Sequence, residues 1–309
     1  MSRWCVADIP DQTGRTVLVT GATSGLGLCT ATVLARKGAT VLMTCRDPKR
    51  GDAARERVRC EGDSVGATLI QLDLADLTSV RKAANQVREL TGDRLDVLVN
   101  NGGVMATPAR FSVDGFELQI ATNHLGHAAL TWLLAPALTP GARVITVSSL
   151  AHYGGGLDVK DLNFDRRRYN PITAYSASKL ANLLFTFELD RRARAAGRNL
   201  LALAAHPGLA DTDLVANSAR MYSAGPLVPA VRWGTKLFTQ RVTNGALPQL
   251  YAATAPHVHS GEYFGPTSLG QTRGAPGRVA PSAAACNEHT AGLLWQRTAE
   301  LTGVTPDPA

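Results

Sequence analysis

The stretch Arg15-Thr-Val-Leu-Val-Thr-Gly-Ala-Thr-Ser-Gly-Leu-Gly27 decides the fold of this chain of 309 residues. Its first half is an apolar, β-branched run that is typical of a buried strand, and its second half contains three glycines. Residues 28–37 then have the pattern of a helix, which Gly38 ends, and residues 40–44 form a second apolar run. This order of strand, glycine-rich turn, helix and strand predicts one unit of a parallel sheet covered by helices.

The glycine-rich turn has the spacing G-x-x-x-G-x-G. Glycines at such positions allow a tight turn, close approach of a diphosphate to the backbone, and close packing of the helix on the strand. The positive end of the helix dipole then faces the diphosphate. Because a strand and a helix flank the turn, we expect a dinucleotide site rather than an ordinary turn. The residues expected to contact the dinucleotide here are Gly21, Thr23, Ser24, Gly25, Leu26 and Gly27.

The alternation of strand and helix continues through the rest of the chain. Further strands are predicted at residues 68–72, 95–99, 144–147 and 200–205, and helices at residues 77–90, 113–137 and 286–301. The pattern predicts an α/β fold with a doubly wound parallel sheet of about seven strands, flanked by helices, in a single domain, 1–309. Ligands of such sheets bind at the carboxyl ends of the strands.

Tyr175 and Lys179 lie four residues apart in the run Ala174-Tyr-Ser-Ala-Ser-Lys179, so a helix would present both side chains on one face. A positive charge beside a phenol stabilises the phenolate and lowers the tyrosine pKa from its usual value of about 10. Such a tyrosine can exchange protons near neutral pH, which indicates general acid/base chemistry. The alternative interpretation is a surface helix with an accidental pair.

Charge and composition limit the partners of the chain. The net charge is +7 and the pI is near 9.4. Apart from residues 46–59 and the run Arg166-Arg-Arg168 the basic residues are dispersed, so we expect a solvated basic face and no nucleic-acid partner. No apolar stretch approaches the length of about 18 residues that a membrane span needs, so neither a span nor a signal peptide is predicted, and a cytoplasmic location is expected. The five cysteines lack C-x-x-C spacing, which indicates reduced thiols without a disulfide or a metal site.

Four motifs along the chain point to one family. They are Thr20-Gly-Ala-Thr-Ser-Gly-Leu-Gly27, Asn100-Asn-Gly-Gly103, Ser148-Ser149 and Tyr175-x-x-x-Lys179. Together they resemble the short-chain dehydrogenase/reductase family, and the resemblance covers nearly the whole chain. The stretches Asn123-His-Leu-Gly-His127, Val147-Ser-Ser-Leu-Ala-His152 and His206-Pro-Gly208 are similar to its retinol-dehydrogenase-like branch, which includes many bacterial oxidoreductases. The resemblance implies a Rossmann-type fold and hydride transfer to or from a nicotinamide dinucleotide.

The resemblance also implies the catalytic set Asn123, Ser149, Tyr175 and Lys179. In the family pattern, Tyr175 exchanges a proton with the substrate oxygen while Ser149 hydrogen-bonds that oxygen. Lys179 binds the nicotinamide ribose and lowers the tyrosine pKa. Asn123 holds a water that links the lysine to solvent; the alternative is that this residue only satisfies buried backbone groups.

Further residues are placed along the dinucleotide by the same resemblance. Asp73 would accept a hydrogen bond from the adenine amino group, with an ordinary helix-capping aspartate as the alternative. The turn Asn100-Asn-Gly-Gly103 lets a ribose lie close to the backbone, and its third residue is alanine in most relatives. The segment His206-Pro-Gly-Leu-Ala-Asp-Thr212 passes beside the nicotinamide carboxamide, although Thr212 also fits a helix N-cap. The additional contacts implied are Asp73, Leu74, Asn100, Gly102, Tyr175, Lys179, Pro207, Gly208 and Thr212.

The end of the second predicted strand bears on the choice between NADP and NAD. An NAD enzyme usually has an acidic residue there to bind the ribose 2′-hydroxyl, whereas the sequence here is Cys45-Arg46-Asp47. An arginine can pair with a 2′-phosphate and stack on the adenine, so Arg46 favours NADP(H). NAD(H) stays open, because a shift of one residue would bring Asp47 into the ribose-binding position.

The function that follows is an NADP(H)-dependent oxidoreductase that acts on a carbonyl or alcohol of a small molecule. Residues 213–243 are rich in apolar and aromatic side chains and suit a lid over a lipophilic substrate, or packing on the core or on a second subunit of a homo-oligomer. Residues 153–173 contain three glycines in a row and are expected to form a surface loop. Two alternatives are NAD-dependent oxidation of a steroid-like or retinoid-like alcohol and a non-catalytic NADP-binding redox sensor.

Overall fold

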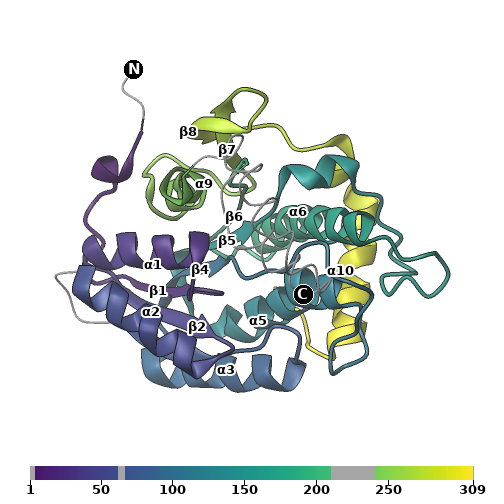
Figure 1. Cartoon of the computed structure of the whole chain (residues 1–309), viewed down its shortest axis with the longest axis horizontal. Coiled ribbons are helices and arrows are strands. Elements are labelled where there is room, and N and C mark those ends of the chain that lie inside the picture. The colour runs from purple at the N-terminus through teal and green to yellow at the C-terminus, as the bar shows by residue number, and fades with distance from the viewer. Residues whose placement is uncertain (1–3, 62–66, 210–240, 309) are drawn as a thin grey trace, which may run out of the picture.

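One sheet of eight strands forms the centre of the described part of the protein, and helices lie on both of its faces (Figure 1). The computed structural model describes residues 4–61, 67–209 and 241–308. The strand order is β3-β2-β1-β4-β5-β6-β7-β8, with every neighbouring pair parallel except β7 and β8. The strands are β1 (Thr16–Val19), β2 (Thr40–Cys45), β3 (Ala67–Gln71), β4 (Leu95–Asn100), β5 (Leu138–Val147), β6 (Leu200–Ala205), β7 (Tyr263–Ser268) and β8 (Arg273–Arg278). The doubly wound α/β prediction is confirmed, and the antiparallel β8 brings the sheet to eight strands.

The helices fall into two layers. Their bounds are α1 (Gly25–Arg36), α2 (Pro48–Glu61), α3 (Leu77–Thr91), α4 (Leu118–Ile120), α5 (Gly126–Leu134), α6 (Pro171–Ala195), α9 (Val242–Thr254) and α10 (Glu288–Thr302). On the central strand β1, Val17 and Val19 join the core formed with α1, α2 and α9, while Leu18 joins the core formed with α3, α5 and α6. Because successive side chains of a strand point to opposite faces, apolar residues at every position of β1 bury both faces of the sheet.

The helix predicted at residues 113–137 begins later than expected. Val113 is 79% exposed, and Gly115 adopts a φ of +81°, which lies in the left-handed region. The carboxylate of Glu117 then accepts hydrogen bonds from the backbone N–H groups of Gln119 and Ile120, so the helix begins at α4. A single π-helical turn, Ala121–Leu125, joins α4 to α5.

Helix α10 packs mainly on other helices. It runs from Glu288 to Thr302, close to the predicted 286–301, and packs on α6 and α5 (yellow in Figure 1). The ring of Trp295 stacks on Phe185 of α6 at a centroid distance of 5.4 Å and meets Trp132 of α5 at 4.8 Å. These aromatic contacts extend the core that lies under α5 and α6.

The loop predicted at residues 153–173 is partly buried. Asp161 is 3% exposed and Leu162 is 6% exposed, and Arg167 pairs with the Asp161 carboxylate at 2.8 Å. Residues from Pro171 onward already belong to α6. The segment that we expected to be a lid, 213–243, lies outside the described residues up to residue 240, and its last two residues form the start of α9.

Candidate active site

The first and fourth strands end in turns that touch each other. Gly21 follows β1 with a φ of +64°, and a Cβ atom on it would lie 2.7 Å from the Cα atom of Gly102, in the turn after β4. A Cβ atom on Gly27 would overlap the carbonyl oxygen of Gly21. Gly25, in contrast, has a φ of +55° and faces open space. The first and third glycines therefore serve close packing, and the second leaves room beside the helix N-terminus for a ligand.

The start of α1 fits a diphosphate. Ser24 is the N-cap residue, and its side chain makes no capping hydrogen bond, so it does not cover the first N–H groups of the helix. Thr23, Ser24 and Leu26 are partly exposed around this end. The N–H groups and the helix dipole together favour an anionic group at this place.

A methyl group at Gly27 should damage this packing. We expect Gly27→Ala to lower the free energy of unfolding by about 1–3 kcal/mol, because the added carbon overlaps the Gly21 carbonyl. It should also weaken dinucleotide binding, which titration of the folded variant would measure. Gly292→Ala is the matched control, since Gly292 also lies in a helix but has no atom near its Cβ position. That control should be neutral or stabilising in chemical unfolding; equal losses in the two variants would contradict the packing argument.

The two residues after β2 have different surroundings. Arg46 is exposed at the carboxyl end of the strand. Asp47 accepts a hydrogen bond at 2.9 Å from the backbone N–H of Lys49, at the start of α2. The Asp47 carboxylate therefore caps α2, while the Arg46 guanidinium is accessible at the carboxyl end of β2.

The residues predicted along the rest of the dinucleotide differ in their accessibility. The carboxylate of Asp73 accepts a hydrogen bond at 3.0 Å from the backbone N–H of Ala75, and the side chain is half-buried. A Cβ atom on Gly102 would lie 2.7 Å from the Cδ1 atom of Leu74, so the methyl of an alanine would displace Leu74. Asn100 is 1% exposed, and its amide donates to Thr131 of α5 at 3.0 Å. The Asn100 side chain therefore points into the core, and the predicted contact of this turn with the cofactor would involve its backbone.

Ser149, Tyr175 and Lys179 come together where β5 ends and α6 begins. Helix α6 is capped by Asn170, which places Tyr175 in its second turn. Tyr175 is 7% exposed, and its hydroxyl is close enough to the Ser149 side chain for that side chain to influence its pKa. Lys179 is 4% exposed, and its Nζ atom donates to the carbonyl oxygen of Val147 at 3.0 Å and lies 5.8 Å from the centre of the Tyr175 ring.

The ionisation of this pair differs from the expectation. Burial raises the pKa of Tyr175, and the hydrogen bond from Ser149 acts in the opposite direction. Burial also lowers the pKa of Lys179 to about 8. The lowering of the tyrosine pKa that the sequence suggested is therefore not found, because desolvation disfavours the charged form of both groups.

Asn123 lies in the π-helical turn and joins two segments. Its Oδ1 atom accepts from the backbone N–H of Val104 at 2.8 Å, while its Nδ2 atom donates to the Val104 carbonyl at 2.9 Å and to Ser178 Oγ at 2.9 Å. A Cβ atom on Gly103 would lie 3.0 Å from Asn123 Oδ1 and 3.7 Å from Lys179 Nζ. The amide thus satisfies backbone groups, as one interpretation expected, and it also borders the space beside the lysine. The water-holding role stays a prediction.

The segment after β6 begins as predicted and then leaves the described residues. Gly208 has a φ of +65°, and its N–H donates to Nδ1 of His206 at 3.2 Å. Pro207 and Gly208 are partly exposed at the carboxyl end of β6. Thr212 lies outside the described residues.

Sequence reasoning did not assign a role to His152. Its Nδ1 atom lies 2.7 Å from the carbonyl oxygen of Ser149, and its Nε2 atom accepts from the backbone N–H of Ser282 at 3.1 Å. The ring thus ties the Ser149 backbone to the segment before α10. The signal in the sequence was the position of His152 three residues after Ser149, which is too common a spacing to stand out by itself.

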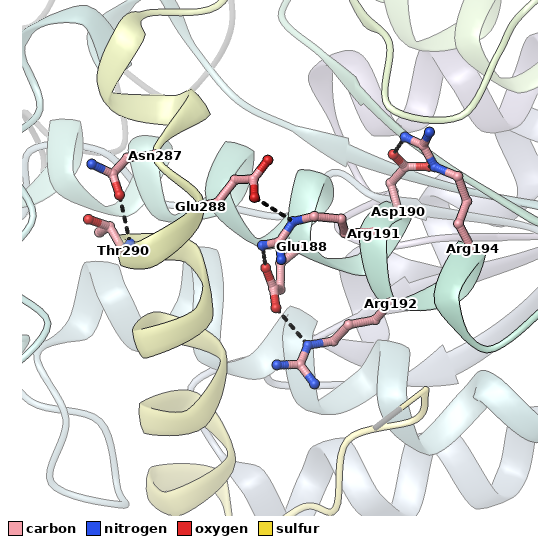
Figure 2. A network of polar contacts seen from close by, with 8 residues as sticks. All are labelled: Glu188, Asp190, Arg191, Arg192, Arg194, Asn287, Glu288 and Thr290. Atoms are coloured by element: carbon pink, nitrogen blue, oxygen red, sulfur yellow. Dashed lines mark hydrogen bonds and ion pairs between the residues drawn. The ribbon is translucent and has the colours of Figure 1, made fainter.

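A cavity of about 700 Å³ lies away from Tyr175, on the far half of α6. Ion pairs within α6 join Glu188 to Arg191 and Arg192, and Asp190 to Arg194, while Glu288 of α10 lies 4.0 Å from Arg191 (Figure 2). Three arginines and three carboxylates line the cavity: Arg191, Arg194, Arg278, Asp190, Glu262 and Glu288. The formal charges cancel, so the lining does not select a charged ligand.

The sheet, the open helix N-terminus, the buried tyrosine and lysine and the partly exposed serine define an oxidoreductase that uses a nicotinamide dinucleotide and acts on a small molecule. The chain belongs to the short-chain dehydrogenase family, since the family model for short-chain dehydrogenases matches residues 15–223. Its retinol-dehydrogenase-like character is also confirmed. It is 40% identical to retinol dehydrogenase 13 of Homo sapiens over 298 residues, which cover 94% of this chain and 85% of the relative.

Solved structures agree with this assignment. A crystal structure of an uncharacterised protein from Mycobacterium paratuberculosis is 44% identical, with a TM-score of 0.82 and 98% of each chain covered. A short-chain dehydrogenase from Burkholderia cenocepacia J2315 in complex with NADP is 26% identical, with a TM-score of 0.62, covering 82% of this chain and 96% of the other. Among the residues that the structure describes, none of the helices is both long and apolar enough to cross a membrane.

Proposed function

We propose that this enzyme transfers a hydride between NADP(H) and the carbonyl or alcohol of a lipophilic small molecule, with Tyr175 as the general acid/base. The observation that carries the proposal is the grouping of Tyr175, Lys179 and Ser149 at the carboxyl end of β5, with Lys179 Nζ 5.8 Å from the centre of the Tyr175 ring. Ser149 is partly exposed beside the buried Tyr175, and in this proposal the substrate oxygen hydrogen-bonds both hydroxyls. The glycine-rich turn follows β1 at the same carboxyl-terminal end of the parallel strands.

In the reduction direction, Tyr175 donates its proton to the substrate oxygen and Ser149 donates a hydrogen bond to the same atom. The raised pKa of Tyr175 suits this direction, because the phenol is protonated at neutral pH before substrate arrives. Lys179 supports the developing phenolate with its charge, and Asn123 keeps the segment after β4 beside the lysine. The nicotinamide supplies or accepts the hydride when it is bound.

The preference for NADP(H) over NAD(H) rests on Arg46. Its guanidinium is exposed where a 2′-phosphate would lie, and the neighbouring Asp47 is engaged at the start of α2. The NADP complex of the Burkholderia cenocepacia relative adds support. The proposed preference for NADP over NAD therefore depends on the exposed Arg46 guanidinium and on the Asp47 carboxylate, which caps α2 instead of facing a ribose.

Arg46→Ala should weaken NADPH binding about 10- to 100-fold, because a charge-assisted hydrogen bond to phosphate is lost. Binding of NADH should change less than about threefold, since NADH has no 2′-phosphate for the arginine to contact. Titration of each nucleotide into the wild-type and variant proteins measures both constants. Arg50→Ala is the control, because Arg50 is an exposed cation on α2 four residues further along. An equal loss for NADPH in the two variants would instead indicate general attraction by the basic surface.

The lipophilic character of the substrate is supported by the relative named retinol dehydrogenase 13 and by the apolar side chains of residues 213–243. The homo-oligomer, the single-domain organisation and the cytoplasmic location stay predictions.

A panel of carbonyl compounds tests the function. The panel ranges from short aldehydes to retinal-like aldehydes and steroid ketones, and the loss of NADPH absorbance measures turnover. Turnover that rises with chain length is expected. Turnover with NAD⁺ and long alcohols alone would favour the alternative dehydrogenase, and NADPH binding without any turnover would favour a redox sensor.

A further inference from the structure

His127 occupies a buried position between two parts of the candidate site. It lies in the first turn of α5 and is 2% exposed. Its Nδ1 atom is 3.1 Å from the carbonyl oxygen of Asn123, one turn earlier, and its Nε2 atom is 2.9 Å from Thr20 Oγ1, at the end of β1. One ring therefore contacts both the π-helical turn and the start of the dinucleotide-binding turn.

The partners determine which ring nitrogen carries the proton. A carbonyl oxygen can only accept, so Nδ1 of His127 must donate to Asn123. Thr20 Oγ1 accepts hydrogen bonds from the backbone N–H groups of Asn101 at 2.8 Å and Gly102 at 2.9 Å, which use both of its lone pairs. The single hydroxyl proton of Thr20 is then left for Nε2 of His127, at a shorter distance than the 3.2 Å to the Val99 carbonyl. Every donor and acceptor in this chain of contacts is matched only when His127 is the neutral Nδ1–H tautomer.

The surroundings keep the ring neutral. Burial is the main cause that lowers the pKa of His127 to about 4, and the charge of Lys179 acts in the same direction. The other titratable group on this turn, His124, has its pKa lowered to about 3 by burial and by His127. A protonated His127 would aim a second N–H at a hydroxyl whose lone pairs are already taken.

We propose that His127 is a positioning residue that locks the Asn123 turn to the dinucleotide-binding turn, so that nucleotide binding and the Asn123 side chain are held in one geometry. The inference deepens the proposed function and rests on it for the roles of Asn123 and the glycine-rich turn. The link runs from Asn123 through His127 and Thr20 to the backbone of Asn101 and Gly102. Gly102 is the residue whose Cα atom faces Gly21 across the two turns.

His124 supplies a matched control from the same turn. It is 1% exposed, and its Nε2 atom lies 2.8 Å from Thr298 Oγ1 of α10, so it links the turn to the outer helix. The two histidines are buried to a similar extent, but His127 contacts the turn after β1, whereas His124 contacts α10. A merely structural role for His127 predicts that both substitutions act alike, whereas a positioning role predicts different effects on the nucleotide.

The tautomer is the first test, and it needs neither nucleotide nor turnover. NMR of the full-length protein with labelled histidine should show a neutral Nδ1–H signal that disappears in His127→Gln. The signal should persist to about pH 5, because the pKa lies near 4. An Nε2–H tautomer for His127, or protonation near pH 6.5, would overturn the inference.

Nucleotide binding and turnover are the second test. We expect His127→Phe to weaken NADPH binding about tenfold and to lower kcat at saturating NADPH about tenfold, through loss of the two hydrogen bonds. The melting temperatures of His124→Phe and His127→Phe should fall by similar amounts. In His124→Phe, however, the dissociation constant for NADPH and kcat should stay within about twofold of wild type. A His127→Phe protein that folds with both constants unchanged, or equal losses in the two variants, would refute the coupling. If the wild-type protein binds NADPH but reduces no carbonyl, the proposed reaction fails, and the tautomer and the binding constants still decide the role of His127.

Discussion

Turnover of the Tyr175→Phe variant should fall at least about a thousandfold, because general acid/base catalysis by a positioned group contributes about 10²–10⁴ in rate. The phenylalanine ring fills the same buried space and lacks only the hydroxyl that is the proposed proton donor. Affinity for NADPH should change less than about threefold, since the proposed nucleotide contacts of α1 and Arg46 are untouched. Steady-state assays of carbonyl reduction, with NADPH titration of the same preparations, measure both quantities.

The control for this variant is Tyr263→Phe. Tyr263 lies on β7, is 2% exposed and is close enough to Tyr175 for the two phenols to influence each other electrostatically. Removing its hydroxyl perturbs the same region without removing the proposed proton donor, so turnover should stay within about threefold. Substantial turnover in Tyr175→Phe, or an equal loss in Tyr263→Phe, would exclude Tyr175 as the acid/base group.

Lys179→Met should stabilise the protein while it lowers turnover at least about a hundredfold. Burial lowers the pKa of Lys179 from 10.5 to about 8, so the folded state holds this proton less tightly than the unfolded state does. Below pH 8 the buried ammonium therefore destabilises the fold, by an amount on the order of 3 kcal/mol, and methionine removes that cost. The Val147 carbonyl keeps a partner in the variant, because Asn182 also donates to it at 3.1 Å. A stability gain with a loss of activity is expected where a site holds a charge for chemistry.

The stability difference between Lys179→Met and wild type should depend on pH in a definite direction. The lysine proton is lost from the folded state near pH 8 and from the unfolded state near pH 10.5, so the cost is fully present below about 8 and disappears as the pH rises to about 10.5. The advantage of Lys179→Met in chemical unfolding should shrink across the same interval. Lys160→Met is the control, because Lys160 is exposed and should show neither effect. A methionine variant that is less stable than wild type at pH 7 would show that the ammonium stabilises the fold.

Much of the fold could be predicted from the sequence, because the patterns that indicate it lie within short stretches of the chain. The apolar run that became β1 is buried on both faces, and a glycine such as Gly21 is required by a left-handed φ and by contact with Gly102. Spacing also placed Tyr175 and Lys179 on one face of α6. The late start of the helix after Glu117 could not be read in this way, because the 113–117 segment bends through Gly115 before the carboxylate caps the helix. The direction in which Asn100 points was also hidden, since it depends on Thr131 of a different element.

The sequence by itself determined the order of strands and helices, the glycine-rich turn and the identity of the polar residues at the strand ends, because each depends on neighbours within a few positions. Only the tertiary structure decided the ionisation of Tyr175 and Lys179, since burial, which comes from distant segments, disfavours the charged form of both groups. It also decided that His127 meets Thr20, 107 positions away in the chain. Such contacts follow from packing of the sheet against α5, which no local pattern of residues records.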